Sequence, residues 1–202
     1  MANFSPMENT HTMIRRNVRL DLQHSVYFTR EAFSTGNETL AKILRPNREG
    51  RRSKVILYVD EGLLDGNPNL PKRINQYFRA HDEEINLVHE PLFIKGGEAA
   101  KNDWSLVEKV WSDINEHSIC RHSFVVIVGG GAALDLVGFA ASTAHRGIRL
   151  VRLPTTTLSQ GDGGIGVKNV VNFFVKKNWV GAIAVPDATV TDASLLRRLP
   201  EN

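Results

Sequence analysis

Three consecutive glycines, Gly129, Gly130 and Gly131, separate one apolar run, residues 124–128, from a second apolar run that begins at Ala132. A strand, a glycine turn and a helix in this order are typical of phosphate sites, because unpaired amides at a helix start point outward and the helix dipole favours negative charge. Glycine also lets a diphosphate approach the backbone closely. The spacing differs from the usual dinucleotide fingerprint, G-x-G-x-x-G. Taken alone, the triplet fits a tight structural turn equally well.

Two carboxylates lie where they could assist such a site. Asp135 falls one turn into the predicted helix, where it could face a polar ligand group, orient the loop, or simply be an acidic residue favoured by the helix dipole. Asp60 ends the apolar run at residues 54–60. A carboxylate at the end of a buried strand can bind ribose hydroxyls, although it can also begin an ordinary loop.

The elements that must position these residues alternate along the chain. Hydrophobic spacing predicts strands at residues 17–28, 54–60, 85–94, 124–128 and 148–154, and helices at residues 37–44, 71–80, 102–117 and 132–145. This alternation predicts an α/β fold with a Rossmann-like, mostly parallel, doubly wound sheet and an N-terminal strand extension. The period-two pattern of residues 17–28 predicts a half-buried strand in a mixed or antiparallel part of the sheet. After Pro154 a long, polar, glycine-rich stretch is typical of a functional loop.

Composition limits the classes of partner. Hydrophobic residues make up 42% of the 202-residue chain, its net charge is +3, and its single cysteine, Cys120, excludes an intrachain disulfide. No apolar run approaches the roughly 20 residues that a membrane helix needs, so we expect a cytoplasmic protein without a membrane partner. The basic segment at residues 45–54 could be a phosphate or nucleic-acid patch, or a solvated loop. No aromatic residue interleaves its arginines, which favours the loop, and we expect no nucleic-acid partner.

Four stretches of this sequence resemble the 3-dehydroquinate synthase family of sugar-phosphate cyclases in order and spacing. They are "GGEAAK" (96–101), "GGGAALDLVGFAASTAHRG" (129–147), "PTTTLSQGDGGIGVKNVVN" (154–172) and "KKNWVGAI" (176–183). Iron-dependent alcohol dehydrogenases and glycerol dehydrogenases share the glycine triplet, the following Asp and the P-T-T. After that point the chain follows the cyclase pattern, with Gln160, Asp162, Gly166 and Lys168.

The resemblance implies NAD as cofactor and a phosphorylated sugar as substrate. It assigns the NAD diphosphate to Gly129, Gly130, Gly131 and Asp135, the adenosine side to Asp60, Glu98 and Lys101, and the nicotinamide half to Thr155 and Thr156. It places Asp162, Lys168, Lys177 and Asn178 facing the substrate and cofactor, and it matches Arg146 to an arginine that reaches a substrate phosphate in a homodimeric parent.

The activity implied is that of a carbon–oxygen lyase of the shikimate pathway, which leads to aromatic amino acids. NAD transiently oxidises a secondary alcohol, phosphate leaves by elimination, the ketone is reduced again, and an aldol step closes the ring. The ammonium groups of Lys168 and Lys177 would stabilise alkoxide and phosphate charge. A non-catalytic NAD-binding module and an iron- or glycerol-type dehydrogenase are the alternatives.

Two departures from the family pattern qualify this interpretation. The family loop D-S-S-x-G-G-K-T-A reads "DGGIGVKNV" here, which points to another branch of the cyclases. The family's Glu and His ligands for Zn²⁺ or Co²⁺ follow the "LP" segment and have no counterpart before Asn202, so a metal is expected only in a full-length parent. His117, Cys120 and His122 are too few for a closed zinc site. We therefore expect a flexible segment at 1–16, an NAD-binding domain at 17–190, and at 191–202 the start of a linker to an absent helical metal-binding domain.

Overall fold

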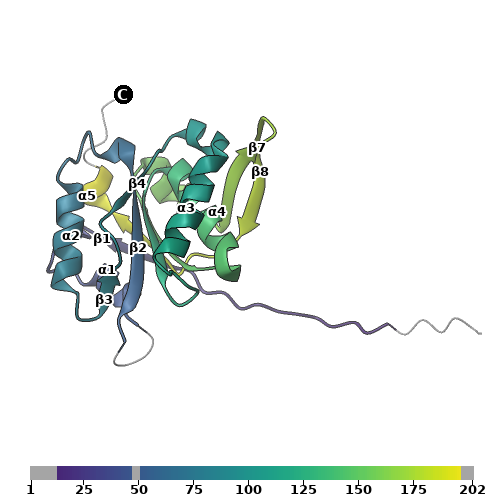
Figure 1. Ribbon diagram of the computed structural model, residues 1–202, viewed down its shortest axis with the longest axis horizontal. Coiled ribbons are helices and arrows are strands. Elements are labelled where there is room, and N and C mark those ends of the chain that lie inside the picture. The colour runs from purple at the N-terminus through teal and green to yellow at the C-terminus, as the bar shows by residue number, and fades with distance from the viewer. Residues whose placement is uncertain (1–12, 47–50, 197–202) are drawn as a thin grey trace, which may run out of the picture.

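The computed structural model describes residues 13–46 and 51–196. Its centre is a seven-stranded sheet in the order β1-β9-β6-β5-β2-β3, with β4 also pairing with β2 (Figure 1). All of its strand pairs are parallel. The strands are β1 (Ser25–Thr29), β2 (Ser53–Asp60), β3 (Ile85–Leu87), β4 (Leu92–Ile94), β5 (Phe124–Gly129), β6 (Arg149–Pro154) and β9 (Ala188–Asp192). The expectation of a mostly parallel α/β fold is confirmed.

Helices cover both faces of this sheet (Figure 1). α1 (Thr39–Leu44) and α2 (Leu70–Ala80) pack on one face, while α3 (Trp104–Glu116) and α4 (Gly131–Thr143) pack on the other. Side chains of β2 alternate between the two cores: Leu57 joins the α1 and α2 side, and Ile56 and Tyr58 join the α3 and α4 side. Burial on both faces explains why the central strands are continuous apolar runs rather than alternating ones.

The N-terminal strand differs from its prediction. β1 is shorter than residues 17–28, and it pairs parallel to β9, with Ser25 opposite Ala188, so the expected mixed or antiparallel position was wrong. A period-two pattern reports an extended chain but not the direction of its neighbour. Before β1, residues 13–24 have no regular secondary structure and run away from the body of the domain (Figure 1).

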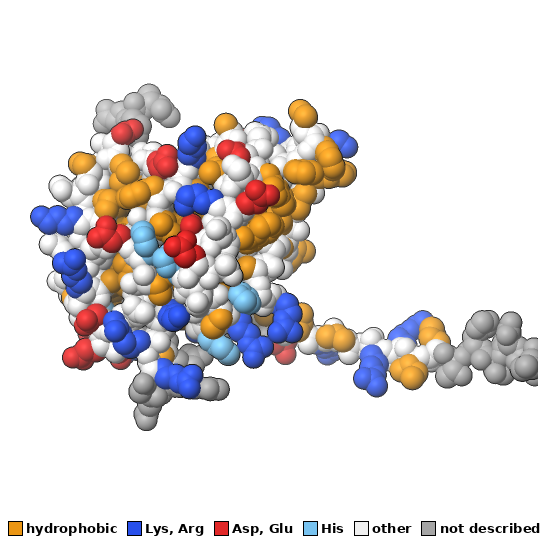
Figure 2. Space-filling view, viewed as in Figure 1, with side chains coloured by type: hydrophobic (Ala, Val, Ile, Leu, Met, Phe, Trp, Pro, Cys, Tyr) orange, Lys and Arg blue, Asp and Glu red, His pale blue; other side chains and the backbone are white. Residues whose placement is uncertain are grey.

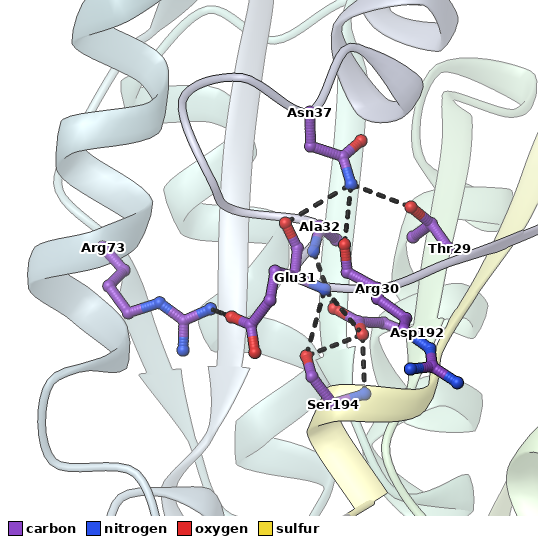
Figure 3. Close-up of polar contacts among 8 residues, drawn as sticks. All are labelled: Thr29, Arg30, Glu31, Ala32, Asn37, Arg73, Asp192 and Ser194. Carbon is purple, nitrogen blue, oxygen red and sulfur yellow. Dashed lines mark hydrogen bonds and ion pairs between the residues drawn. The ribbon is translucent and has the colours of Figure 1, made fainter.

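A buried carboxylate fixes the far edge of the sheet. Asp192 Oδ2 accepts a hydrogen bond from the Ala32 amide at 2.7 Å, and its Oδ1 accepts from the amides of Glu31 at 3.1 Å and Ser194 at 2.8 Å (Figure 3). Arg73 of α2 forms an ion pair with Glu31 in the same group. The folded unit therefore includes β9, which ends at Asp192, and the short α5 (Ala193–Leu196).

The stretch after Pro154 contains more secondary structure than predicted. A single π-helical turn at Ser159–Gly163 is followed by an antiparallel hairpin of β7 (Lys168–Phe173) and β8 (Lys176–Ile183). The expectation of a continuous loop was wrong for residues 168–172, where the polar residues Asn169 and Asn172 are buried against the domain. The hairpin lies beside α4, and the ring of Phe173 contacts the ring of Trp104 at 5.4 Å between centroids. Figure 2 shows hydrophobic side chains gathered over this part of the molecule.

Replacing Gly138 in α4 by Ala is expected to lower the free energy of unfolding by about 1–3 kcal/mol, the usual cost of overpacking. A Cβ at this position would overlap Oδ1 of the buried Asn169 on β7. Gly131→Ala in the same helix is the matched control, because a Cβ there meets no atom within 4 Å. Urea unfolding measures both variants. Equal free energies of unfolding for Gly138→Ala and Gly131→Ala would show that the close approach of α4 and β7 does not restrict the side chain at residue 138.

Candidate functional site

The parallel sheet places the ends of four strands at one edge, with a change of direction between two of them. From β2 the chain crosses to β3 and β4 on one side, and then returns to β5 on the other side of β2. Open α/β sheets bind ligands in the crevice at such a switch point, beyond the carboxyl ends of the strands. A cleft of about 530 Å³ lies there, lined by residues 60–63, 95–97, 130, 155 and 156.

Asp60 joins the loops that form the walls of this cleft. Its carboxylate accepts hydrogen bonds from the amides of Gly62 at 3.1 Å and Gly130 at 3.3 Å, and the residue is only 9% exposed. A Cβ on Gly96 would overlap this carboxylate, and a Cβ on Gly129 would lie 3.0 Å from Asp60 Cβ. Residues 96 and 129 therefore need to be glycine, because the loops after β4 and β5 close around Asp60 and leave no space for a Cβ.

The other glycines at the cleft are free of such crowding. A Cβ on Gly131 or on Gly97 would meet no atom within 4 Å, although Gly97 has a φ of 79° that favours glycine. The first hydrogen bond of α4 runs from the Leu134 amide to the Gly130 carbonyl at 3.0 Å. The amides of residues 131–133 therefore have no acceptor within the helix. This turn combines open space with unpaired backbone donors, which is the arrangement an anion requires.

Two threonines follow β6 at the same edge and differ in their surroundings. Thr155 is fully buried, and within residues 13–46 and 51–196 its hydroxyl has no hydrogen-bond partner. Thr156 Oγ1 lies 2.7 Å from Ser159 Oγ and helps to start the π-helical turn. A buried hydroxyl without a partner is costly in a closed structure. Thr155 therefore offers a donor and acceptor that a ligand in the cleft could use.

A second group of predicted residues gathers between the short 3-10 helix Glu98–Asn102, α4 and the hairpin. Lys101 is 5% exposed, and its Nζ donates to Asp135 Oδ2 at 2.9 Å and to Asn178 Oδ1 at 2.7 Å. Asn172 of β7 accepts from the Asn178 amide at 2.8 Å. Asp135 thus faces Lys101. This network attaches the hairpin to α4, the helix that begins at the cleft. Sequence reasoning missed the part played by Asn172.

Replacing Lys101 by Met is expected to lower the free energy of unfolding at neutral pH by about 2–3 kcal/mol, because it leaves a largely buried carboxylate without its ion pair. Burial raises the pKa of Asp135, and the hydrogen bond and charge of Lys101 oppose that rise. Without Lys101 the folded-state pKa rises further above its unfolded value. The variant should therefore lose stability as the pH increases through the titration of Asp135.

Urea unfolding between about pH 4 and pH 8 measures this pH dependence. Lys42→Met is the control, because Lys42 belongs to an exposed pair with Glu38, and such pairs contribute about 0–1 kcal/mol. If Lys101→Met and Lys42→Met lowered the free energy of unfolding equally, with the same pH dependence, the buried pair of Lys101 and Asp135 would stabilise the fold no more than an exposed pair does.

The remaining predicted site residues are exposed. Asp162 lies in the π-helical turn, Lys168 begins β7, Lys177 lies on β8, and Arg146 follows α4 with a φ of 66°. Glu98 Oε1 accepts a 3.5 Å hydrogen bond from Asn172 Nδ2. None of these five residues lines the cleft beside Asp60.

Sequence reasoning also missed Arg152 of β6, which is completely buried. Its guanidinium donates to the carbonyls of Gly164, Gly166 and Lys168, and to Asn169 Oδ1 at 2.5 Å. Four acceptors from one loop therefore meet at a single side chain. An arginine in the middle of an otherwise apolar buried strand was the signal that could have identified it.

Neither a metal site nor a membrane helix is found in the described residues. Within residues 13–46 and 51–196, no three His, Cys, Asp or Glu side chains are grouped so that they could hold a metal ion. In the same ranges, no helix has both the length and the hydropathy that a membrane crossing requires.

The comparisons with known proteins agree with this geometry. The family model for the N-terminal part of 3-dehydroquinate synthase matches residues 91–202, which is more than half of the chain. The chain belongs to the 3-dehydroquinate synthase family. This membership confirms the resemblance stated above.

Relatives in the 3-dehydroquinate synthase family are longer than this chain. The 3-dehydroquinate synthase of Azotobacter vinelandii is 32% identical over 161 residues, covering 80% of this chain and 41% of that protein. That of Pyrobaculum islandicum is 44% identical over 110 residues, covering 54% and 32%. The solved structure of ValA, the 2-epi-5-epi-valiolone synthase of Streptomyces hygroscopicus, with NAD⁺ and Zn²⁺ bound, matches with a TM-score of 0.78 and 27% identity, covering 92% of this chain and 47% of that one. The chain spans less than half of each of these proteins.

One departure of this chain from the usual 3-dehydroquinate synthase loop has a structural explanation. Asn169, which follows the loop lysine, is fully buried and accepts from Arg152 while donating to the Ala184 carbonyl at 3.3 Å. Arg152 and Asn169 thus form a pair that fixes the start of β7.

Proposed function

We propose that this chain is the NAD-binding half of a sugar-phosphate cyclase in the 3-dehydroquinate synthase family. The observation that carries the proposal is the cleft at the β2–β5 switch point, where unpaired amides of α4 meet a glycine with space beside it. Such helix starts favour diphosphate through both hydrogen bonds and the helix dipole.

The residues around the cleft fit a dinucleotide. The amides of residues 131–133 would hold the diphosphate. Asp60 would keep the walls of the cleft in place through the amides of Gly62 and Gly130. The free hydroxyl of Thr155 would hydrogen-bond the nicotinamide end. Lys95 also lines the cleft and adds a cation that sequence reasoning did not assign.

The hairpin would contribute the residues that contact the substrate. Lys101 and Asp135 hold the hairpin near its turn through Asn178, so that Lys168 and Lys177 could present ammonium groups to a substrate phosphate as preorganised charges. Bound NAD would supply reversible hydride transfer at a secondary alcohol of the sugar, which acidifies the neighbouring C–H so that phosphate can leave. Asp162 would face the substrate from the π-helical turn. Arg146 follows the end of α4 that lies away from the cleft, so it would reach the substrate phosphate of a second copy in a dimeric parent.

The reaction class is tested by following two products at once. A protein that contains this chain together with the further length of its relatives is expected to release inorganic phosphate from a phosphorylated sugar without accumulating NADH. Accumulation of NADH with an alcohol substrate, and no phosphate release, would instead identify a dehydrogenase. Binding of NAD with neither product would identify a non-catalytic module.

A further inference from the structure

A second hollow lies at the opposite edge of the sheet, where strands β2, β5 and β6 begin. It has a volume of about 330 Å³ and is lined by the residues at these strand starts, including Ser53, Ser123 and Arg149. The eight residues of β2 separate it from the switch-point cleft by roughly 25 Å, at about 3.3 Å for each residue of a strand. It is therefore separate from the proposed NAD site.

The lining of this hollow is strongly cationic. Arg51, Arg52, Lys54 and Arg149 contribute four positive charges, and His122 adds a group that can become charged. Among the lining residues within 13–46 and 51–196, none is acidic. Arg149 is paired with Asp187 at 2.6 Å, whereas Arg51, Arg52 and Lys54 form no ion pair with any residue in 13–46 or 51–196. Figure 2 shows Lys, Arg and His side chains gathered at the lower edge of the molecule, where β2 begins.

Two buried serines, each held by a hydrogen bond, line the inner part of the hollow. Ser53, which is 5% exposed, donates to the Leu44 carbonyl, and Ser123, which is 3% exposed, accepts from the Cys120 amide at 3.2 Å. The exposed Cys120 lies in the lining, with its Sγ 3.6 Å from Ser123 Oγ. Hydrogen bonds from the His122 amide and the Ser123 hydroxyl lower the pKa of this thiol, and Lys54 contributes further.

We propose that this hollow, named the amino-edge pocket, binds a small organic polyanion of the phosphorylated-metabolite class. The starts of β2 and β6 place four cationic side chains around one concavity, and its volume is near the lower end of the usual range for small-molecule sites, about 300–1,000 Å³. A nucleotide is less suitable because the neighbouring Phe124 ring is already covered by the Arg149 guanidinium at 4.0 Å. A nucleic acid would require a groove with stacking platforms, and the described part of the lining contains no aromatic ring other than His122.

The only cysteine of the chain, Cys120, provides a local reporter. The experiment measures its rate of reaction with 5,5′-dithiobis(2-nitrobenzoate), an anionic disulfide, and with 4,4′-dithiodipyridine, an uncharged one, with and without inorganic pyrophosphate. We expect pyrophosphate to slow the anionic reagent in a saturable manner, by about tenfold at saturation. Sodium chloride of equal ionic strength should have a much smaller effect, because simple screening does not saturate.

Substitutions assign the effect to the pocket. Arg51→Gln/Lys54→Gln should lower the rate with the anionic reagent about threefold to tenfold and abolish protection by pyrophosphate. The rate with the uncharged reagent should fall less, because it reflects only the higher pKa of the thiol without Lys54. Arg30→Gln/Lys72→Gln is the matched control, because it removes one arginine and one lysine from exposed positions elsewhere. Both variants alter exposed side chains, so folding should be preserved, and circular dichroism checks it.

Two results would overturn the proposal. The first is protection of Cys120 by pyrophosphate no better than that by sodium chloride, and the second is equal protection of the two double variants. Because the reporter is at the amino edge, pyrophosphate bound in the switch-point cleft would leave the labelling rate unchanged. The result is therefore independent of the proposed NAD site.

Discussion

Replacing Arg152 by Met is expected to lower the free energy of unfolding by about 3–5 kcal/mol, which is among the largest effects of a single substitution. The guanidinium is completely buried and donates to three carbonyls and one side-chain amide oxygen of residues 164–169. Methionine has a similar length but no donor, so these acceptors would lose their hydrogen bonds while still buried. Equilibrium unfolding in urea measures the loss.

Arg149→Met in the same strand is the matched control for Arg152→Met. Arg149 forms a partly exposed ion pair with Asp187, and its loss should cost only about 1 kcal/mol. Loosening of the loop should also expose its backbone, so hydrogen exchange of residues 164–169 should quicken in Arg152→Met alone. A loss no greater than that of the control would show that the loop finds its hydrogen bonds elsewhere.

Replacing Gly131 by Glu is expected to weaken NAD binding by about 10- to 100-fold without weakening the fold. A Cβ at residue 131 meets no atom within 4 Å, so a side chain can begin there without a clash. Glutamate is a better helix former than glycine and is favoured in a first turn, so the free energy of unfolding should stay the same or increase. The same carboxylate would repel the diphosphate at the amides of residues 131–133.

Gly131→Gln separates charge from size in this experiment, because it introduces nearly the same volume without the charge. We expect Gln to weaken NAD binding less than Glu does. Titration calorimetry measures both affinities, and thermal unfolding checks both folds. Unchanged NAD affinity in Gly131→Glu would show that the diphosphate does not lie at the start of α4.

Much of the fold could be predicted because burial on both faces leaves a strong pattern. The apolar run before Asp60 and the run before Gly129 predicted β2 and β5, and the amphipathic spacing of Trp104, Val107 and Trp111 predicted α3. β1 was harder to place, because an edge strand of five residues carries a period-two pattern that also fits exposed, extended chain. β7 was missed because its buried polar residues, Asn169 and Asn172, have the composition of a loop.

The candidate site has two parts, the cleft and the Lys101 network, and the sequence predicted the first better than the second. The glycine turn and Asp60 are adjacent in space because the ends of parallel strands meet at one edge, which strand order can suggest. The partners of Lys101 are not predictable in this way, since Asp135 is 34 residues away and Asn178 is 77 residues away along the chain. The amino-edge pocket likewise combines three strand starts that only the sheet order brings together.

The central claim is that the start of α4 binds the diphosphate of a nicotinamide dinucleotide. The most direct test titrates the 202-residue chain with NADH and follows energy transfer from its three tryptophans to the nucleotide. We predict a saturable signal with a stoichiometry of one, which NAD⁺ reverses and which nicotinamide riboside, lacking the diphosphate, does not. The absence of saturable transfer up to about 5 mM NADH, which corresponds to a binding free energy weaker than about −3 kcal/mol, would contradict the claim.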